Sequence, residues 1–193
     1  MEGKDYETVL PAGYVSALTI DATNGKFALR MNLAAMLPVI PAVILALHMM
    51  PKKPDGAFAQ KMLLFCGALL LNIVLHELVH GAAYRALTHR KLSFGLKLSC
   101  AYCGVPDIYC YRRTALISLL APFTVFTILY GALAAFLGDA VLRALAVVLL
   151  GIHLGGCAGD LYDAWLFLTR FRDPLILMRD TGPAQTFYVK ASE

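Results

Sequence analysis

Two histidines and a glutamate near the middle of the chain have the spacing of a zinc-binding motif. The segment reads His76-Glu77-Leu78-Val79-His80. Residues four apart share one face of an α-helix, so the two imidazoles can converge on one cation with Glu77 beside them. In metallohydrolases with this pattern, the histidines bind zinc and the glutamate is the general base. His76 and His80 are therefore candidate ligands of Zn²⁺, and Glu77 is the candidate catalytic residue.

The motif lies in an apolar setting. Residues 62–75, directly before it, contain no charged side chain. Hydrophobic residues make up 59% of the chain and charged residues 16%, and the mean hydropathy is +0.66. In soluble domains roughly 45–50% of the residues are hydrophobic and about 25% are charged. In a membrane span each ionisable group costs several kcal/mol unless it is paired, so a bound metal explains these residues better than chance does.

Four apolar runs approach or exceed the ~20 residues that cross a bilayer. We expect transmembrane helices near residues 31–50, 62–87, 114–138 and 141–168. The expected organisation is an N-terminal segment (1–30), a transmembrane metalloprotease-like core (31–169) and a C-terminal tail (170–193). The expected fold class is an all-α membrane protein with about four transmembrane helices and a small β-like hairpin or edge segment between the second and third.

The hairpin is predicted from alternation. Phe94, Leu96 and Leu98 alternate with small or polar residues, which is the period of a strand, and residues 104–107 are the expected turn. Residues 15–20 and 26–29 are expected to be short strands or an interfacial segment, with Asn24-Gly25 as a turn signal between them. Residues 186–189 are also strand-like.

Basic residues indicate the orientation. Of the 17 Lys and Arg residues, 13 lie in segments 1–30, 85–113 and 170–193. Basic residues concentrate on the cytoplasmic side of membrane proteins, so both termini are expected there. The cluster of Arg85, Arg90 and Lys91 then reads as a membrane anchor and not as a nucleic-acid patch. The expected partners are the lipid bilayer and a membrane protein or peptide substrate, with no nucleic acid.

A third metal ligand has to come from elsewhere, because catalytic zinc usually takes three protein ligands and leaves one position open. Asp160 is preferred, since it lies deep in the fourth span beside glycines that let helices approach closely. Asp163 and His153 remain alternatives, and His153 could instead orient a ligand or bind substrate.

The five cysteines do not form a disulfide framework, because their number is odd and two lie in apolar runs. Cys100, Cys103 and Cys110 could bind a second metal or form a redox pair. Small apolar filler is the simpler interpretation.

Several segments together resemble a known family. They are His76 to Gly81, Phe94 to Lys97, Ala121-Pro122, Gly156 to Leu161 and the opening Leu10 to Tyr14. They resemble the putative zincin peptidase family of small bacterial and archaeal integral membrane proteins, which is similar to site-2-type intramembrane zinc metalloproteases.

The resemblance implies roles for the same residues. His76, His80 and Asp160 would be the metal ligands, Glu77 the base, and the location a prokaryotic cytoplasmic membrane. Site-2 proteases typically have Gly after this Asp, whereas here Gly159 precedes Asp160 and Leu161 follows it. The departure concerns the identity of the third ligand and not the general scheme.

The expected function is that of a zinc-dependent intramembrane endopeptidase. A zinc-activated water would attack a peptide bond, with Glu77 accepting its proton. The alternatives are a non-proteolytic membrane protein with a structural or transported metal, and a hydrolase of lipid-linked amides or esters. A structural or transport site has no need of Glu77, whose presence favours hydrolysis.

Overall fold

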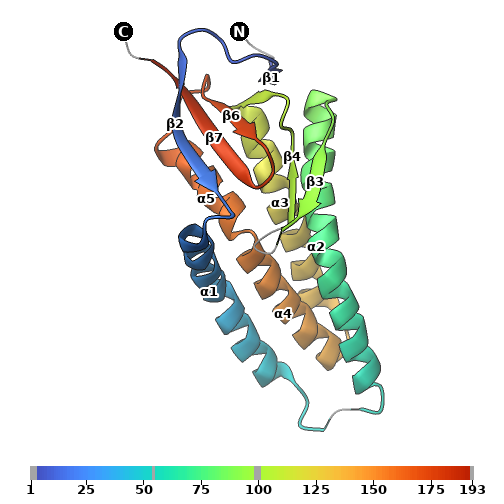
Figure 1. Ribbon diagram of the computed structural model, residues 1–193. Coiled ribbons are helices and arrows are strands. Elements are labelled where there is room, and N and C mark those ends of the chain that lie inside the picture. The colour runs from blue at the N-terminus through green and yellow to red at the C-terminus, as the bar shows by residue number, and fades with distance from the viewer. Residues whose placement is uncertain (1–3, 54, 98–100, 192–193) are drawn as a thin grey trace. The chain divides into compact units, whose positions relative to one another are not determined.

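The computed structural model describes residues 4–53, 55–97 and 101–191, which form five helices and seven strands (Figure 1). The chain divides into two compact units. We call Met1–Leu29, His76–Ala121 and Gly159–Glu193 the sheet unit, and Arg30–Leu75 and Pro122–Ala158 the helix unit. Each unit is described by itself.

Long apolar helices dominate the chain. The helices are α1 (Gly25–Met49), α2 (Phe58–Thr88), α3 (Arg112–Phe136), α4 (Ala140–Gly156) and α5 (Ala158–Thr169). Among the described residues α1, α2 and α3 are long and apolar enough to cross a membrane, and α4 with α5 makes a fourth span only if the pair is counted together. These helices are compatible with a membrane protein, although four separate spans are not confirmed.

Glycines of α4 allow close packing inside the helix unit. A Cβ built on Gly155 would lie 2.7 Å from the carbonyl oxygen of Ala35, and one built on Gly151 would collide with Ala42 of α1. Small residues bring helix backbones together in this way. In contrast, Gly131 of α3 has no neighbour within 4 Å of a built Cβ. The two helices α1 and α4 therefore depend on glycine at their contact.

This difference gives a matched test of packing. Gly151→Ala should lower the free energy of unfolding by about 1–3 kcal/mol, because the added methyl overpacks the contact with α1. Gly131→Ala should leave it unchanged or raise it by roughly 0.5–1 kcal/mol, because glycine is unfavourable in a helix interior. Unfolding midpoints in detergent measure both. Equal midpoints for the two variants would contradict the close contact at Gly151.

An antiparallel sheet forms the other unit. Its strands are β1 (Tyr6–Glu7), β5 (Tyr109–Tyr111), β6 (Leu177–Asp180), β7 (Ala184–Lys190) and β2 (Tyr14–Asp21), in that spatial order. The strands expected at 15–20 and 186–189 are present, and they pair with each other, as Figure 1 shows for β2 and β7. The expected all-α class is not confirmed, because this sheet accompanies the helices.

A separate hairpin joins β3 (Ser93–Leu96) to β4 (Ala101–Gly104), with Ser93 opposite Gly104. The predicted hairpin is therefore present among the described residues, whereas the predicted position of its turn is wrong. Residues 104–107 leave β4 and lead into β5. Leu98 of the predicted alternation lies outside the described residues.

Residues 26–29 are helical and not extended, so that prediction is also wrong. The side-chain oxygen of Asn24 accepts hydrogen bonds from the backbone N–H groups of Lys26 (3.0 Å) and Phe27 (3.2 Å). A side chain in this position caps a helix N-terminus and satisfies donors that lack an intrahelical partner. The Asn24-Gly25 pair thus begins α1 instead of turning between strands.

The sheet unit has its own apolar core. Phe187 of β7 packs against Phe167 of α5 and Phe171, with ring centroids 4.9 and 4.8 Å away. Ile108 and Met178 are fully buried in the same cluster. This core fixes α5 on the sheet, and Asp160 is in the first turn of α5.

Candidate metal centre

Three side chains of the sheet unit bring one ligand atom each to a common point. Nε2 of His76 lies 3.2 Å from Oδ2 of Asp160, and Nε2 of His80 lies 3.3 Å from the same oxygen. The two Nε2 atoms are 3.2 Å apart. The three residues predicted as ligands are thus adjacent, with the atoms that can bind a metal turned toward one another.

Two helices position these atoms. His76 and His80 follow each other by one turn on α2, and their rings meet edge to face at 4.9 Å. Asp160 comes from α5, 84 residues after His76. Their side chains are 12%, 8% and 21% exposed, so the group is largely shielded from solvent.

A backbone contact on the other ring nitrogen orients His80. Its Nδ1 lies 2.8 Å from the carbonyl oxygen of Ser118 on α3, to which it can donate. A neutral imidazole that donates from Nδ1 presents the lone pair of Nε2 to a metal. A backbone carbonyl carries no sequence signal, so this contact could not be predicted.

The separations fit zinc. Ligand atoms about 2.0–2.2 Å from a tetrahedral zinc ion lie about 3.3–3.6 Å from each other, and the distances between the three atoms here are at the short end of that range. The three observed distances are 3.2, 3.2 and 3.3 Å. Two neutral nitrogens and one carboxylate oxygen are also a common catalytic zinc set with one open position. The residues present therefore fit the metal that the motif implies.

Glu77 follows His76 directly on α2 and is partly buried. It is not one of the three residues whose ligand atoms converge. Glu77 therefore stays a candidate general base and is not a candidate ligand of this group.

The alternative ligand Asp163 occupies a different place. It is only 4% exposed, and its Oδ1 has no hydrogen-bond partner within the described part of the chain. It is three residues after Asp160 on α5 but is not part of the converging group. The structure thus brings Asp160, and not Asp163, to the two histidines.

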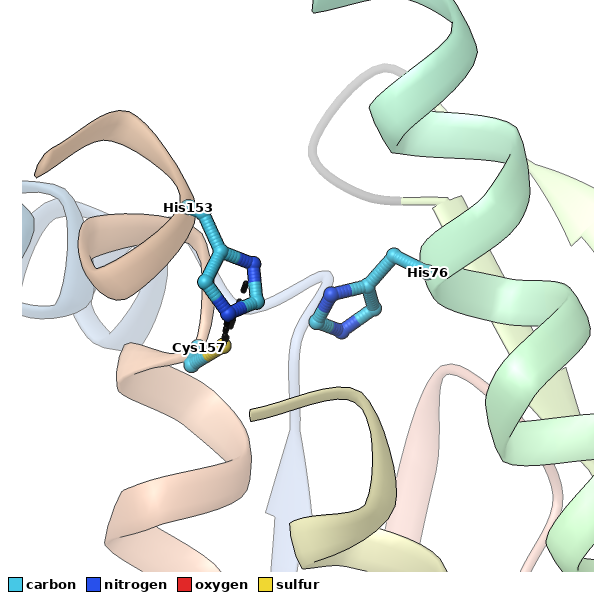
Figure 2. Close-up of side chains that lie close together, drawn as sticks. All are labelled: His76, His153 and Cys157. Carbon is cyan, nitrogen blue, oxygen red and sulfur yellow. Dashed lines mark hydrogen bonds between the residues drawn. The ribbon is translucent and has the colours of Figure 1, made fainter. Parts of the chain in front are cut away.

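The other alternative, His153, belongs to the helix unit. Its ring packs against Phe126 and Tyr130 at centroid distances of 5.5 and 5.7 Å. Figure 2 shows Cys157 beside it, with Sγ 3.7 Å from Nε2. His76, drawn in the same figure, belongs to the sheet unit.

The predicted cysteine cluster is only partly described, because Cys100 lies outside the described residues. Cys103 and Cys110 are buried in the sheet unit. Burial raises the pKa of Cys103 to about 12 and raises that of Cys110 further. Thiols with such pKa values are protonated at neutral pH, which favours their role as apolar filler over a thiolate metal site.

A buried acid in the sheet was not anticipated. Asp180 at the end of β6 is 3% exposed, and its Oδ2 accepts a 2.7 Å hydrogen bond from the hydroxyl of Tyr84. Burial raises the pKa of Asp180 to about 6. The partners are 96 residues apart, and the sequence marks Asp180 only by the Thr-Gly-Pro turn that follows it.

Comparison with known proteins identifies a family. The family described as "Putative zincin peptidase" matches residues 69–174, a range that contains His76, Glu77, His80 and Asp160. The chain matches no curated protein and no solved structure. The matched range is more than half of the 193 residues, and the family description suggests a zinc metallopeptidase. The chain therefore belongs to the putative zincin peptidase family.

Proposed function

We propose that the protein is a zinc-dependent peptidase that cleaves membrane-associated polypeptides, with His76, His80 and Asp160 as ligands and Glu77 as general base. The observation that carries the proposal is the convergence of three ligand atoms at 3.2–3.3 Å. Family membership supports the same chemistry.

The side chains divide the work. His76 and His80 supply neutral nitrogens, and Asp160 supplies the one negative ligand. Zinc in this setting would polarise the scissile carbonyl and lower the pKa of a bound water toward about 7. Glu77 accepts the proton of the attacking water and passes it to the leaving amine. The carbonyl of Ser118 holds His80 in the tautomer that this arrangement needs.

The apolar helices support a membrane location and a membrane-associated substrate. Exposed apolar side chains line α1 and α2, among them Leu33, Leu37, Leu63 and Leu70. Such surfaces suit lipid. We propose a multi-pass protein of a prokaryotic cytoplasmic membrane with both termini cytoplasmic, as the distribution of basic residues favours.

The β3–β4 hairpin is the proposed place for substrate. Each of its strands has one strand partner among the described residues, so each keeps an outer edge. An extended peptide adding to such an edge would have its backbone groups paired and its helix locally unfolded. We propose that substrate adds as a strand here in the way suggested for site-2-type intramembrane proteases.

Metal removal tests the function. Purified protein in lipid vesicles should create new peptide termini in labelled casein, and a chelator should abolish them until zinc is returned. Mass spectrometry of the products identifies the bond that is cleaved. Zinc-dependent release of lipid-linked acyl groups without new peptide termini would instead establish the hydrolase of amides or esters. No zinc-dependent product of either kind would contradict hydrolysis.

A further inference from the structure

We propose that Tyr84 and Asp180 are positioning residues that hold the β3–β4 hairpin against the helix carrying His76 and His80. The effect of these two residues on substrate binding rests on the proposed function. The contacts that they make do not depend on it. All residues concerned belong to the sheet unit.

The first contact starts one turn beyond the motif. Tyr84 follows His80 by four residues on α2 and is 1% exposed. Its hydroxyl donates to Oδ2 of Asp180 at 2.7 Å. Hydrogen bonds to charged groups are stronger than neutral ones, and a buried acceptor that loses its donor is costly. This bond therefore ties α2 to the end of β6.

Asp180 also shapes the turn between β6 and β7. Its Oδ1 accepts from the backbone N–H of Gly182 at 2.8 Å and from Nε2 of Gln185 at 3.2 Å. Gln185 in turn donates to the carbonyl of Gly182 at 2.9 Å. Gly182 has φ +94°, a conformation that favours glycine. Oδ1 of Asp180 thus stabilises the turn, while Oδ2 of the same carboxylate binds Tyr84.

The turn carries the hairpin. A Cβ on Gly182 would collide with the ring of Tyr102 in β4, and one on Gly104 would collide with the backbone of Gly182. The N–H of Val105, directly after β4, donates to the carbonyl of Asp180 at 2.9 Å. The ring of Tyr102 and the backbone after β4 therefore contact the β6–β7 turn, which Asp180 stabilises.

The β3–β4 hairpin also contacts α2, the helix that carries His76 and His80. A Cβ on Gly81, the residue after His80, would lie 2.7 Å from Phe94 and 3.3 Å from Sγ of Cys103. The hairpin thus contacts α2 directly beside His80, and Figure 1 shows β3 beside α2. Loss of the Tyr84–Asp180 bond would remove the side-chain hydrogen bond between α2 and the end of β6 and leave the apolar contacts, such as those at Gly81, in place.

The expected consequence concerns binding and not the chemical step. The bond holds the strand edge that receives substrate and leaves the three metal ligands in place. Weakening it should therefore raise KM while kcat and zinc content are preserved. A general loss of stability would instead affect every part of the sheet unit.

Amide hydrogen exchange of the full-length protein in lipid nanodiscs tests the proposal. Tyr84→Phe should speed exchange of residues 93–97 and 101–104 about tenfold or more, with little change in β2 and β7. The matched control is Tyr130→Phe, which removes another buried hydroxyl, the donor to Asn72 at 2.8 Å in the helix unit. Asp180→Asn keeps the size of the acceptor and should reproduce the effect of Tyr84→Phe.

The outcomes are distinct. Unchanged exchange in the hairpin of Tyr84→Phe and Asp180→Asn overturns the proposal, as does faster exchange spread evenly over β2, β7 and the hairpin. With labelled casein as the probe, Tyr84→Phe should raise KM at least about threefold and Tyr130→Phe should not. If the unmodified protein cleaves nothing while the hairpin still loosens selectively, the proposed function fails and the positioning role stands.

Discussion

Glu77→Gln should leave zinc bound and lower hydrolysis by about a hundred- to ten-thousandfold, the usual contribution of a general base. Glutamine keeps the shape of the side chain but cannot accept a proton at neutral pH. Because Glu77 is not one of the residues whose ligand atoms converge, zinc binding should be unchanged. Zinc content and the initial rate of casein cleavage, measured on the same sample, check both halves.

The control for Glu77→Gln is Asp107→Asn, which makes the same chemical change at an exposed position of the sheet unit. Its activity should equal that of the unmodified protein. Full activity in Glu77→Gln would remove the catalytic assignment. Loss of zinc in that variant would make Glu77 a ligand.

Asp160→Asn should lose zinc, whereas Asp163→Asn should keep it. Replacing a ligand should weaken zinc binding by more than the 10–100-fold typical of residues that only support ligands, so a loss above about a hundredfold is expected. Asp163 is the matched control because it is an acid on the same helix, is more buried, and is absent from the converging group. Competition with a chromophoric chelator measures the affinity.

A reversed result would be equally clear. If Asp163→Asn loses zinc and Asp160→Asn retains it, the third ligand is Asp163 and the convergence at Asp160 has another cause. If both variants lose zinc, α5 supplies two acids to the centre.

The motif helix and the acid that lies against it could be predicted because their signals are local. The spacing of His76 and His80 defines a helix face, and Asp160 is an acid where an apolar span tolerates few. The structure places Oδ2 of Asp160 against both imidazoles. The roles of these residues stay predictions until metal is measured.

The two longest strands of the sheet, β2 and β7, could be predicted, but its short strands and their pairing could not, because their signals are weak and distant. β1 has two residues, and it pairs with β5 about a hundred residues later, Tyr6 opposite Cys110. β5 and β6 are only three and four residues long and show no apolar–polar alternation, so tertiary pairing and not a local pattern makes them extended. Asn24 illustrates the opposite error, since the same residue type begins turns and caps helices.

The strand order has a consequence for biosynthesis. The first strands of the chain, β1 and β2, occupy the two edges of the sheet, and β2 pairs with β7, which ends at Lys190. At roughly 5–20 residues per second, a ribosome needs about 10–30 s between finishing the first of these partners and finishing the second. The turn that seats the hairpin also forms only then. A nascent chain that already contains His76 and His80 would thus lack the β6–β7 turn and the β2–β7 pairing until synthesis reaches the last strand.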